Sequence, residues 1–420
     1  MKLKQEFLKE AEALPGIDAE ALETALTTTV APVSIRYNNR KTSDLQLNDP
    51  VSWATGAEYL AKRPAFTADP LFHAGCYYVQ EAGSMFVEQA IRQHLDLEKP
   101  LTVLDLCAAP GGKSTHLASL LKDNDVLISN EINKTRADIL TENIQKWGTP
   151  NVIVTRNKPA DFSPLTDLFD CIVVDAPCSG EGMFRKTPEA IEEWSPANVV
   201  QCAQRQREIL EDIWPCLKPG GLLIYSTCTF NLTENEHQVE WMIDEFRADS
   251  LPLETADPAI TSSLVLGVEA ARFFPHKTKA EGFFLSVLQK PEGQKARVRK
   301  MKPAINTLTR KEEQPLYGIL QPNDWTFFSH RSQVFASLPH MTEVLERVSA
   351  HLYPLHIGVP IGELKGTDLI PSPALAFSTV LSRKKFTVIE VTKDQALALL
   401  SRETPVLETP VTGWVLVTFQ

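Results

Sequence analysis

Two cysteines and an aspartate stand where this sequence can do chemistry. Cys228 ends the apolar run LLIYSTCTF, residues 222–230, and Asp175 and Cys178 end the run FDCIVVDAPCSGEG, residues 169–182. Apolar runs of this length are typical of buried strands. Ligand chemistry in open α/β sheets lies beyond the carboxyl ends of the strands. Taken singly, each cysteine is also consistent with an ordinary buried core residue, and the aspartate is consistent with a turn cap. The prediction of a reactive site therefore depends on the three side chains meeting in one crevice.

A glycine-rich turn supplies a second constellation. The string VLDLCAAPGGKSTHLA, residues 103–118, predicts a strand, a tight turn and a helix amino terminus. Its GGKST end imitates a P-loop, but that motif requires glycine where Cys107 stands. Glu131 follows Gly111 by twenty residues, the distance at which an acidic side chain can hold ribose hydroxyls. The joint spacing favours an adenosine-type ligand over a purely structural turn.

Two thiols, a carboxylate and an adenosine site fit methyl transfer to carbon 5 of a pyrimidine. That carbon is a weak nucleophile until a thiolate adds to carbon 6, so covalent catalysis divides one hard step into easier ones. The methyl donor would be S-adenosylmethionine, and the base must leave its stack to reach the pocket.

These residues need a parallel sheet to position them, and the chain predicts one. Between residues 70 and 290 strands alternate with helices, which is the pattern of parallel strands with crossover helices. One predicted helix, Lys134–Trp147, stops at Gly148. The short apolar strands are expected at residues 103–106, 126–129, 152–155, 171–174, 222–226 and 282–288. The predicted fold class is therefore α/β.

Composition limits the class of protein. The chain has 420 residues, 43% of them hydrophobic, and no apolar run long enough to span a membrane, so we expect several soluble domains in the cytoplasm. The seven cysteines form no C-x-x-C pair, which favours reduced thiols and no metal site. A net charge of −11 means that nucleic acid would bind only through a local basic patch.

The flanking regions predict smaller units. Residues 1–69 read as a lead-in domain with two helices and a strand, and residues 312–420 read as a separate α+β module. Residues 291–311 read as a basic linker. With Lys290 included, that stretch holds eight Lys or Arg residues and one acidic residue, so a solvated linker and a phosphate-binding strap are equally weighted readings.

Several strings together resemble one known family. The strings DLCAAPGGKS, DAPCSGEGMFRK, WSPANVVQCAQRQREIL and LKPGGLLIYSTCTFNLTENE follow in this order, and HAGCYYVQEAGSM precedes them. This set resembles the NOL/NOP/Sun RNA cytosine-5 methyltransferases over roughly residues 70–290. The carboxy-terminal module and overall length look most like the bacterial RsmF-type branch, which acts on 16S ribosomal RNA in the small subunit.

The resemblance implies a Rossmann-like class I methyltransferase sheet and roles for single residues. Cys228 matches the nucleophile that attacks carbon 6, and Cys178 matches the thiol that assists release of the methylated base. Lys113 lies at the edge of the catalytic and cofactor sites. The positions that match contacts to S-adenosylmethionine are Cys107, Ala108, Ala109, Pro110, Gly111, Gly112, Lys113, Glu131 and Asp175.

One departure from the family concerns the adenine. Many relatives carry an acidic residue after the third strand, whereas this chain reads TRNKPADF. Asn157 is one candidate for the adenine edge, and Asp161 is the other. Lys113 is a candidate to favour the Cys228 thiolate, although a solvated lysine is an equal reading.

The resemblance also gives expectations for the ends of the chain and for RNA. Arg185 and Lys186 follow the Cys178 loop and are candidates to bind the RNA backbone. The lead-in domain and a PUA-like carboxy-terminal module are expected to dock RNA. Removal of residues 306–420 is expected to leave cofactor binding intact. We expect a monomer that binds 16S ribosomal RNA and no membrane.

The function expected from these observations is S-adenosylmethionine-dependent formation of 5-methylcytosine in 16S ribosomal RNA. A tRNA cytosine-5 methyltransferase and a noncatalytic ribosome-assembly factor that binds RNA are the alternatives kept. A DNA cytosine-5 methyltransferase is a further rival, in which Cys178 after Pro177 would be the nucleophile.

Overall fold

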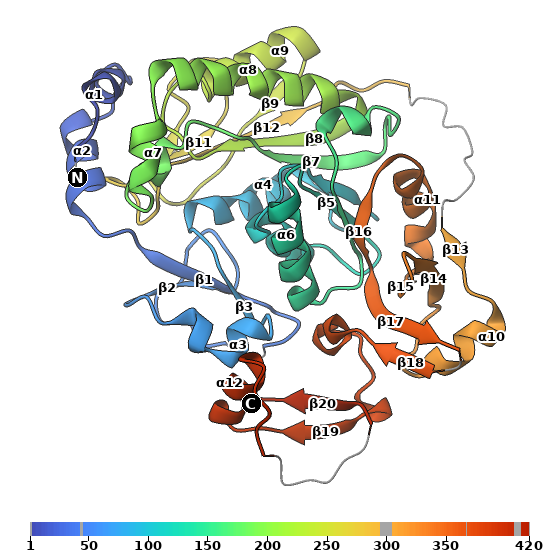
Figure 1. Cartoon of the computed structure of the whole chain (residues 1–420). Coiled ribbons are helices and arrows are strands. Elements are labelled where there is room, and N and C mark those ends of the chain that lie inside the picture. Colours follow the sequence, from blue (N-terminus) through green and yellow to red (C-terminus); the bar gives the residue numbers. More distant parts are fainter. Residues whose placement is uncertain (1, 43–44, 295–304, 367, 407–412, 420) are drawn as a thin grey trace.

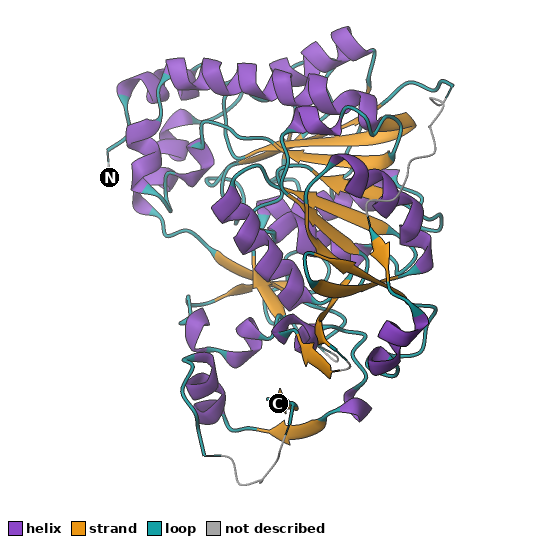
Figure 2. Cartoon of the chain, turned by 45° about the vertical axis from the view of Figure 1, so that its right-hand side comes forward, coloured by secondary structure: helices purple, strands orange, loops and turns teal. Residues whose placement is uncertain are grey.

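A ten-stranded mixed sheet runs through the centre of the protein, with helices on both faces (Figures 1 and 2). The computed structural model describes residues 2–42, 45–294, 305–366, 368–406 and 413–419. The strand order is β10-β11-β12-β8-β7-β4-β5-β6-β16, and β9 pairs with β12. The strands of this sheet are β4 (Thr102–Asp105), β5 (Val126–Asn130), β6 (Val152–Thr155), β7 (Phe169–Asp175), β8 (Leu217–Thr227), β9 (Asp249–Leu251), β10 (Thr261–Ser262), β11 (Ala271–Phe273), β12 (Phe283–Gln289) and β16 (Pro354–Ile357).

The five middle strands, β4 to β8, are parallel, which confirms the predicted α/β sheet. Alternate residues of these strands lie in two apolar layers, one on each face of the sheet, because successive side chains of a strand point to opposite faces. Val103 and Val173 lie in one layer with α4, α5 and α6, and Leu104 and Ile172 lie in the other with α8, α9 and α11. These helices are α4 (Val87–His94), α5 (Gly112–Leu120), α6 (Lys134–Trp147), α8 (Pro196–Ile213), α9 (Glu236–Phe246) and α11 (Thr342–His351).

The crossover helix α6 shows how the sequence sets an element's ends. The Asn133 side chain accepts a hydrogen bond from the backbone N–H of Arg136, which caps the helix start. Gly148 ends the helix with φ +83° and donates its N–H to the carbonyl of Ile144. The observed bounds are those predicted from the sequence, and the helix links β5 to β6 at the edge where the adenosine-type ligand is expected.

The strands and the helices of the amino-terminal region lie in two different parts of the structure. Its strands form a separate sheet in the order β2-β1-β3, and β3 lies beyond residue 69. Helices α1 and α2 instead pack against Phe184, Trp194 and Phe230, which follow the two predicted catalytic cysteines in the chain. The elements are α1 (Gln5–Glu12), α2 (Ala19–Thr28), β1 (Val33–Tyr37), β2 (Ala57–Leu60), α3 (Pro70–His73) and β3 (Tyr77–Val79). The lead-in region therefore contacts the loops that carry the thiols.

The carboxy-terminal region, predicted as a separate module, has an apolar cluster of its own and also contributes to the central sheet and its core. Strand β16 extends the central sheet antiparallel to β6, and α11 buries Leu345 and Val348 in the apolar layer of α8 and α9. The rest of this region forms a five-stranded sheet, a parallel pair of strands and α12, which lies against α3 (Figure 1). Its elements are β13 (Asn306–Thr307), α10 (Arg310–Glu313), β14 (Thr326–His330), β15 (Gln333–Ser337), β17 (Val359–Lys365), β18 (Asp368–Pro371), β19 (Thr387–Glu390), α12 (Lys393–Leu400) and β20 (Val415–Thr418). The sequence pattern predicted an α+β composition for this region but not the core that it shares with the catalytic sheet.

Most of the basic stretch predicted as a linker or strap, residues 295–304, lies outside the described residues. Within the described part of the chain, no helix is both long and apolar enough to cross a membrane.

Candidate active site

The two cysteines predicted to do chemistry lie side by side. Strands β7 and β8 are parallel neighbours, with Asp175 opposite Ser226, so their carboxyl ends bring both following loops together. The Sγ atoms of Cys178 and Cys228 are 3.1 Å apart, and the backbone N–H of Cys228 points at Cys178 Sγ at 3.4 Å. Both residues are partly buried, and all seven cysteines of the chain are free thiols. The predicted convergence of the two strand ends is thus observed.

Two buried carboxylates hold the thiol loops in register. Glu234 accepts hydrogen bonds from the backbone N–H and the hydroxyl of Ser179, from Gln206 Nε2 at 2.9 Å and from Asn231 Nδ2 at 2.8 Å. Burial raises the pKa of the Glu234 carboxyl. Ser179 follows Cys178 directly, so these bonds clamp the Cys178 loop onto the chain that follows Cys228.

Glu181, in the loop that carries Cys178, makes the equivalent hydrogen bonds to the chain that follows Cys228. Its carboxylate accepts from the backbone N–H groups of Phe230 and Asn231, at 2.7 and 3.0 Å, and from the indole N–H of Trp194 at 2.9 Å. Each loop therefore places a buried, multiply bonded carboxylate on the other, which fixes the distance between the two sulfur atoms.

Both carboxylates stand in the sequence motifs, in SGEG and TENE, but were not predicted as site residues. Glutamate is usually solvated, and nothing in one sequence marks a buried one. The sequence feature that could have identified them is their position, because each lies within six residues of a predicted catalytic cysteine.

The Cys178 thiol and the Lys113–Asp175 ion pair set the electrostatics of the site. The hydrogen bond with Cys228 and burial raise the pKa of the Cys178 thiol well above its usual range. Lys113 Nζ lies 2.9 Å from Asp175 Oδ2 and 5.0 Å from the centre of the Phe283 ring. Ser226 donates to Asp175 Oδ1 at 2.9 Å. Lys113 thus lies between the glycine-rich turn and β7, with its charge matched by Asp175.

The glycine-rich turn has the close backbone approach expected from its sequence. Gly111 has φ +116°, and a Cβ atom built there would lie 3.3 Å from Leu140 Cδ1, so a larger residue would be strained. The Ala109–Pro110 peptide is cis. Arg136 Nη2 donates to the carbonyl of Ala109 at 2.8 Å, which anchors the turn to α6. Cys107 is partly buried at the start of the turn and Gly112 begins α5.

Asp105, the last residue of β4, carries an unpaired buried atom at this edge. Its Oδ2 accepts from Ser114 Oγ at 2.6 Å, whereas Oδ1 has no hydrogen-bond partner. Burial raises the pKa of Asp105 to about 7. An unpaired carboxylate oxygen suits a ligand that brings positive charge, and S-adenosylmethionine carries an ammonium and a sulfonium. The residues of this edge therefore fit the predicted cofactor, and Asp105 is an additional candidate contact that was not predicted from the sequence.

Glu131 and Asn157 lie at the ends of the next two strands. Glu131 is buried, accepts from the backbone N–H of Asn133 at 2.9 Å and lies 3.4 Å from Arg136 Nη2. The Asn157 carboxamide bonds both Asp161 and the backbone of Tyr353. The two candidates for the adenine edge are thus hydrogen-bonded to each other.

One expectation about RNA contacts is wrong. The Arg185 side chain is 4% exposed, and its Nε lies 2.8 Å from Glu281 Oε2 while its other nitrogens bond Thr29 and the Ala280 carbonyl. This guanidinium therefore braces the structure and is not available to a phosphate. Lys186 lies 3.7 Å from the same carboxylate and is partly exposed.

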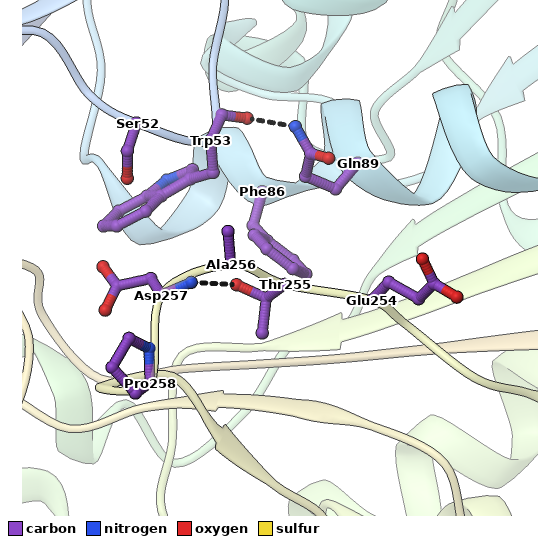
Figure 3. A pocket seen from close by; sticks show the side chains of 9 residues that line it. All are labelled: Ser52, Trp53, Phe86, Gln89, Glu254, Thr255, Ala256, Asp257 and Pro258. Atoms are coloured by element: carbon purple, nitrogen blue, oxygen red, sulfur yellow. Dashed lines mark hydrogen bonds between the residues drawn. The ribbon is translucent and has the colours of Figure 1, made fainter.

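A cavity of about 390 Å³ lies away from the thiols, between the loop of residues 254–258 and the residues Trp53, Phe86 and Gln89 (Figure 3). None of the predicted site residues lines it. In the described part of the chain, no group of His, Cys, Asp and Glu side chains is arranged to hold a metal ion. The thiols and the glycine-rich turn remain the candidate site.

Two family models match the chain. Residues 92–289 match the model described as 16S rRNA methyltransferase RsmB/F, and residues 3–82 match the N-terminal domain of 16S rRNA methyltransferase RsmF. Among curated proteins, ribosomal RNA small subunit methyltransferase F of Aliivibrio fischeri is 34% identical over 71% of this chain and 65% of its own length. The protein of the same name from Escherichia coli is 35% identical over 62% of this chain and 57% of its own length. The chain thus spans less than two thirds of the length of these relatives.

Solved structures show the same fold. A methyltransferase homologue from Pyrococcus horikoshii has a TM-score of 0.53 and 28% identity, covering 69% of this chain and all of its own. NSun6 from the same organism, solved with SFG, has a TM-score of 0.57 and 21% identity, covering 69% of this chain and 99% of its own. The central sheet therefore has the Rossmann-like arrangement of methyltransferases.

Proposed function

Since the chain belongs to the RsmB/F family of 16S rRNA methyltransferases, we propose that it forms 5-methylcytosine in 16S ribosomal RNA. The observation that carries the proposal is the pair of thiols, 3.1 Å apart at neighbouring strand ends, beside a glycine-rich turn. The substrate follows from the family, and the chemistry follows from the site.

Cys228 acts as the nucleophile in this proposal. Its sulfur bonds to carbon 6 of the flipped cytosine, which moves electron density to carbon 5 and makes that carbon reactive. Asp175, three residues before Cys178, forms an ion pair with Lys113 at the end of β7. S-adenosylmethionine, when bound, supplies the methyl group that carbon 5 receives.

Cys178 assists release of the product. After methylation carbon 5 still carries its proton, and the ring becomes aromatic again only when that proton leaves and the bond from carbon 6 to Cys228 breaks. Cys178 Sγ lies next to Cys228 Sγ, so it is within reach of the carbon adjacent to the attacked one. For this role Cys178 must first lose its own proton, which its raised pKa opposes; the hydrogen bond with the Cys228 thiol, the largest cause of that raised pKa, is lost once Cys228 is bonded to the cytosine.

The cofactor would lie along the carboxyl ends of β4, β5 and β6. The turn of residues 107–113 approaches the methionine part, with Asp105 Oδ1 free to pair with its ammonium. Glu131 holds the ribose hydroxyls, and the residues after β6 face the adenine.

RNA docking falls to the outer regions in this proposal. The amino-terminal region up to β3 and the carboxy-terminal region from residue 312 flank the catalytic sheet, and we assign both to RNA contact, the latter as a PUA-like module that also shares the catalytic core. The basic stretch of residues 291–311 links the second of them to β12.

Transfer of a labelled methyl group tests the function. Purified full-length protein is incubated with labelled S-adenosylmethionine and undermethylated small subunits, naked 16S RNA, tRNA or DNA, followed by bisulfite mapping. The proposal predicts label at cytosines of 16S RNA. Label only in tRNA or DNA would support the rival enzymes, and binding of RNA without any transfer would support a noncatalytic assembly factor. Cys228→Ser should abolish transfer, while Cys76→Ser, a partly buried cysteine outside the site, should not.

A further inference from the structure

The carboxy-terminal region reaches the cofactor edge of the sheet at the end of β6. Strand β16 pairs antiparallel with β6, with Pro354 opposite Thr155 and His356 opposite Val154. The pairing continues where Gly358 donates its N–H to the carbonyl of Val152 at 2.9 Å. Without β16, β6 would be the unpaired edge of the parallel sheet, so this region fixes the position of the strand that ends at the adenine side.

The residue just before β16 is hydrogen-bonded to the residues just after β6. The backbone N–H of Arg156 donates to the carbonyl of Tyr353 at 3.1 Å, and the backbone N–H of Tyr353 donates to Asn157 Oδ1 at 2.7 Å. The guanidinium groups of Arg156 and Arg331 lie 4.9 and 3.5 Å from the centre of the Tyr353 ring. Two backbone hydrogen bonds and two cation–π contacts therefore hold Tyr353 at this place.

The hydrogen bond from the Tyr353 N–H sets the orientation of the Asn157 carboxamide. Because Oδ1 accepts from Tyr353, Nδ2 is turned to Asp161 and donates to its Oδ2 at 3.1 Å. The same Oδ2 accepts from the backbone N–H of Lys158 at 2.9 Å. Among the described residues no group bonds Asp161 Oδ1, and the side chain is exposed. One carboxylate oxygen is thus fixed by the protein and the other is presented outward.

Asn130 ties this loop to the glycine-rich turn. Its side chain accepts from the backbone N–H of Asn157 at 3.0 Å and donates to the carbonyls of Asn157 and Leu106, at 3.0 and 3.1 Å. Its own carbonyl accepts from the N–H of Ala108 at 2.8 Å. Asn130 is fully buried, so the ends of β4, β5 and β6 form one rigid frame.

The frame sets where an adenosine base would lie. The N–H of Glu131 bonds the carbonyl of Thr155 at 3.2 Å, so the expected ribose position is next to the end of β6. A nucleoside held by Glu131 therefore directs its base to the loop of residues 157–161. The 6-amino group of adenine is a donor, and a free carboxylate oxygen is the acceptor that suits it.

We propose that the carboxy-terminal region completes the cofactor site, with Asn157 as a positioning residue held by Tyr353 and Asp161 Oδ1 as the acceptor for the adenine 6-amino group. The proposal rests on the proposed function, because it assumes an adenosine-containing cofactor. It also means that the carboxy-terminal region contributes to cofactor affinity and is not confined to RNA docking.

The test compares two ligands that differ only at the base. S-adenosylhomocysteine has a 6-amino group, and S-inosylhomocysteine has a 6-oxo group, which a carboxylate repels. Titration calorimetry with the full-length protein should give a preference for the adenosine compound of about 10- to 100-fold, the range for one hydrogen bond to a charged group.

Asp161→Asn should remove most of this preference, since an amide can accept from the amino group or donate to the oxo group. The inosine compound should bind this variant more tightly than it binds the original protein, a gain that structural damage cannot produce. Asp244→Asn, an exposed change of the same kind on α9, serves as the matched control and should keep the preference. An unchanged preference in Asp161→Asn would overturn the proposal.

Two changes at residue 353 test the role of the carboxy-terminal region. Tyr353→Pro removes the N–H that holds Asn157 and should lower the preference, whereas Tyr353→Ala keeps that N–H and should retain it. Equal loss in both would contradict the assigned role of the backbone bond. If the original protein bound both compounds equally, the adenine assignment alone would fail. If it bound neither, the proposed cofactor would fail as well.

Discussion

Asp105 offers a pH test of how the cofactor edge is built. Its carboxyl group is fully buried at the end of β4, with one oxygen bonded to Ser114 Oγ and the other unpaired. Burial raises its pKa from the usual 3.8 to about 7. The change Asp105→Asn removes the titration but keeps an oxygen that can accept from Ser114.

The sign of the effect follows from proton binding. Between about pH 4 and pH 7 the folded protein holds a proton on Asp105 that the unfolded chain has released, so this group's contribution to stability falls as pH rises through that window. The full loss is about 4 kcal/mol, from 1.36 kcal/mol for each pKa unit, and is an upper bound because local opening admits water. Above pH 7 the contribution stays constant.

Urea unfolding at several pH values between 5 and 8 measures this contribution. The free energy of unfolding of Asp105→Asn, minus that of the original protein, should rise by roughly 2 to 3 kcal/mol from pH 5 to pH 8. Asp244→Asn, the same change at an exposed position on α9, serves as the control. A pH-independent difference for Asp105→Asn would refute the argument that this buried carboxyl is held protonated.

Three further predictions concern the thiol loops and the carboxy-terminal region. Gly182→Ala should lower methyl transfer, the melting temperature and the free energy of unfolding, the last by about 1–3 kcal/mol, because its Cβ would lie 2.5 Å from the carbonyl oxygen of Gly282 beside Cys228. Gly293→Ala, whose Cβ has room, should match the original protein. Equal effects of the two changes would contradict this prediction. Diamide should join Cys178 and Cys228 reversibly, because their sulfur atoms are 3.1 Å apart. Peptide mapping should show the crosslink and dithiothreitol should restore activity, whereas a failure to crosslink would place the two sulfur atoms further apart in solution. Removal of residues 306–420 should give an aggregating protein without a cooperative melting transition, since it exposes β6 and removes α11 from the core; a soluble fragment that still binds S-adenosylhomocysteine would contradict the shared core.

The parallel sheet was predictable because each strand is a short apolar run between helices. The two thiols could be placed together for the same reason, since Cys178 and Cys228 each follow a predicted strand and neighbouring strand ends share one crevice. The end of α6 was predicted from Gly148, and the cap that the Asn133 side chain makes at its start is equally local. Features determined within a few residues were therefore recovered.

Pairing between distant segments was not predictable from the sequence. The run PLHI of β16 is too short to show which strand it joins, and nothing local indicates that α11 covers the catalytic sheet. Burial of polar groups was missed for a similar reason. Arg185 reads as a surface cation, and Glu181 and Glu234 read as solvated acids, until the fold encloses them. These features depend on contacts between segments far apart in the chain.

Trapping of a covalent complex with RNA tests the proposed division of labour between the two thiols. Cys178→Ser, Cys228→Ser and the control Cys76→Ser are each incubated with S-adenosylmethionine and 16S RNA, and protein crosslinked to RNA is measured by denaturing electrophoresis. We expect Cys178→Ser to accumulate the complex, because release is slowed, and Cys228→Ser to form none. Accumulation in Cys228→Ser, with none in Cys178→Ser, would exchange the two roles and contradict the account.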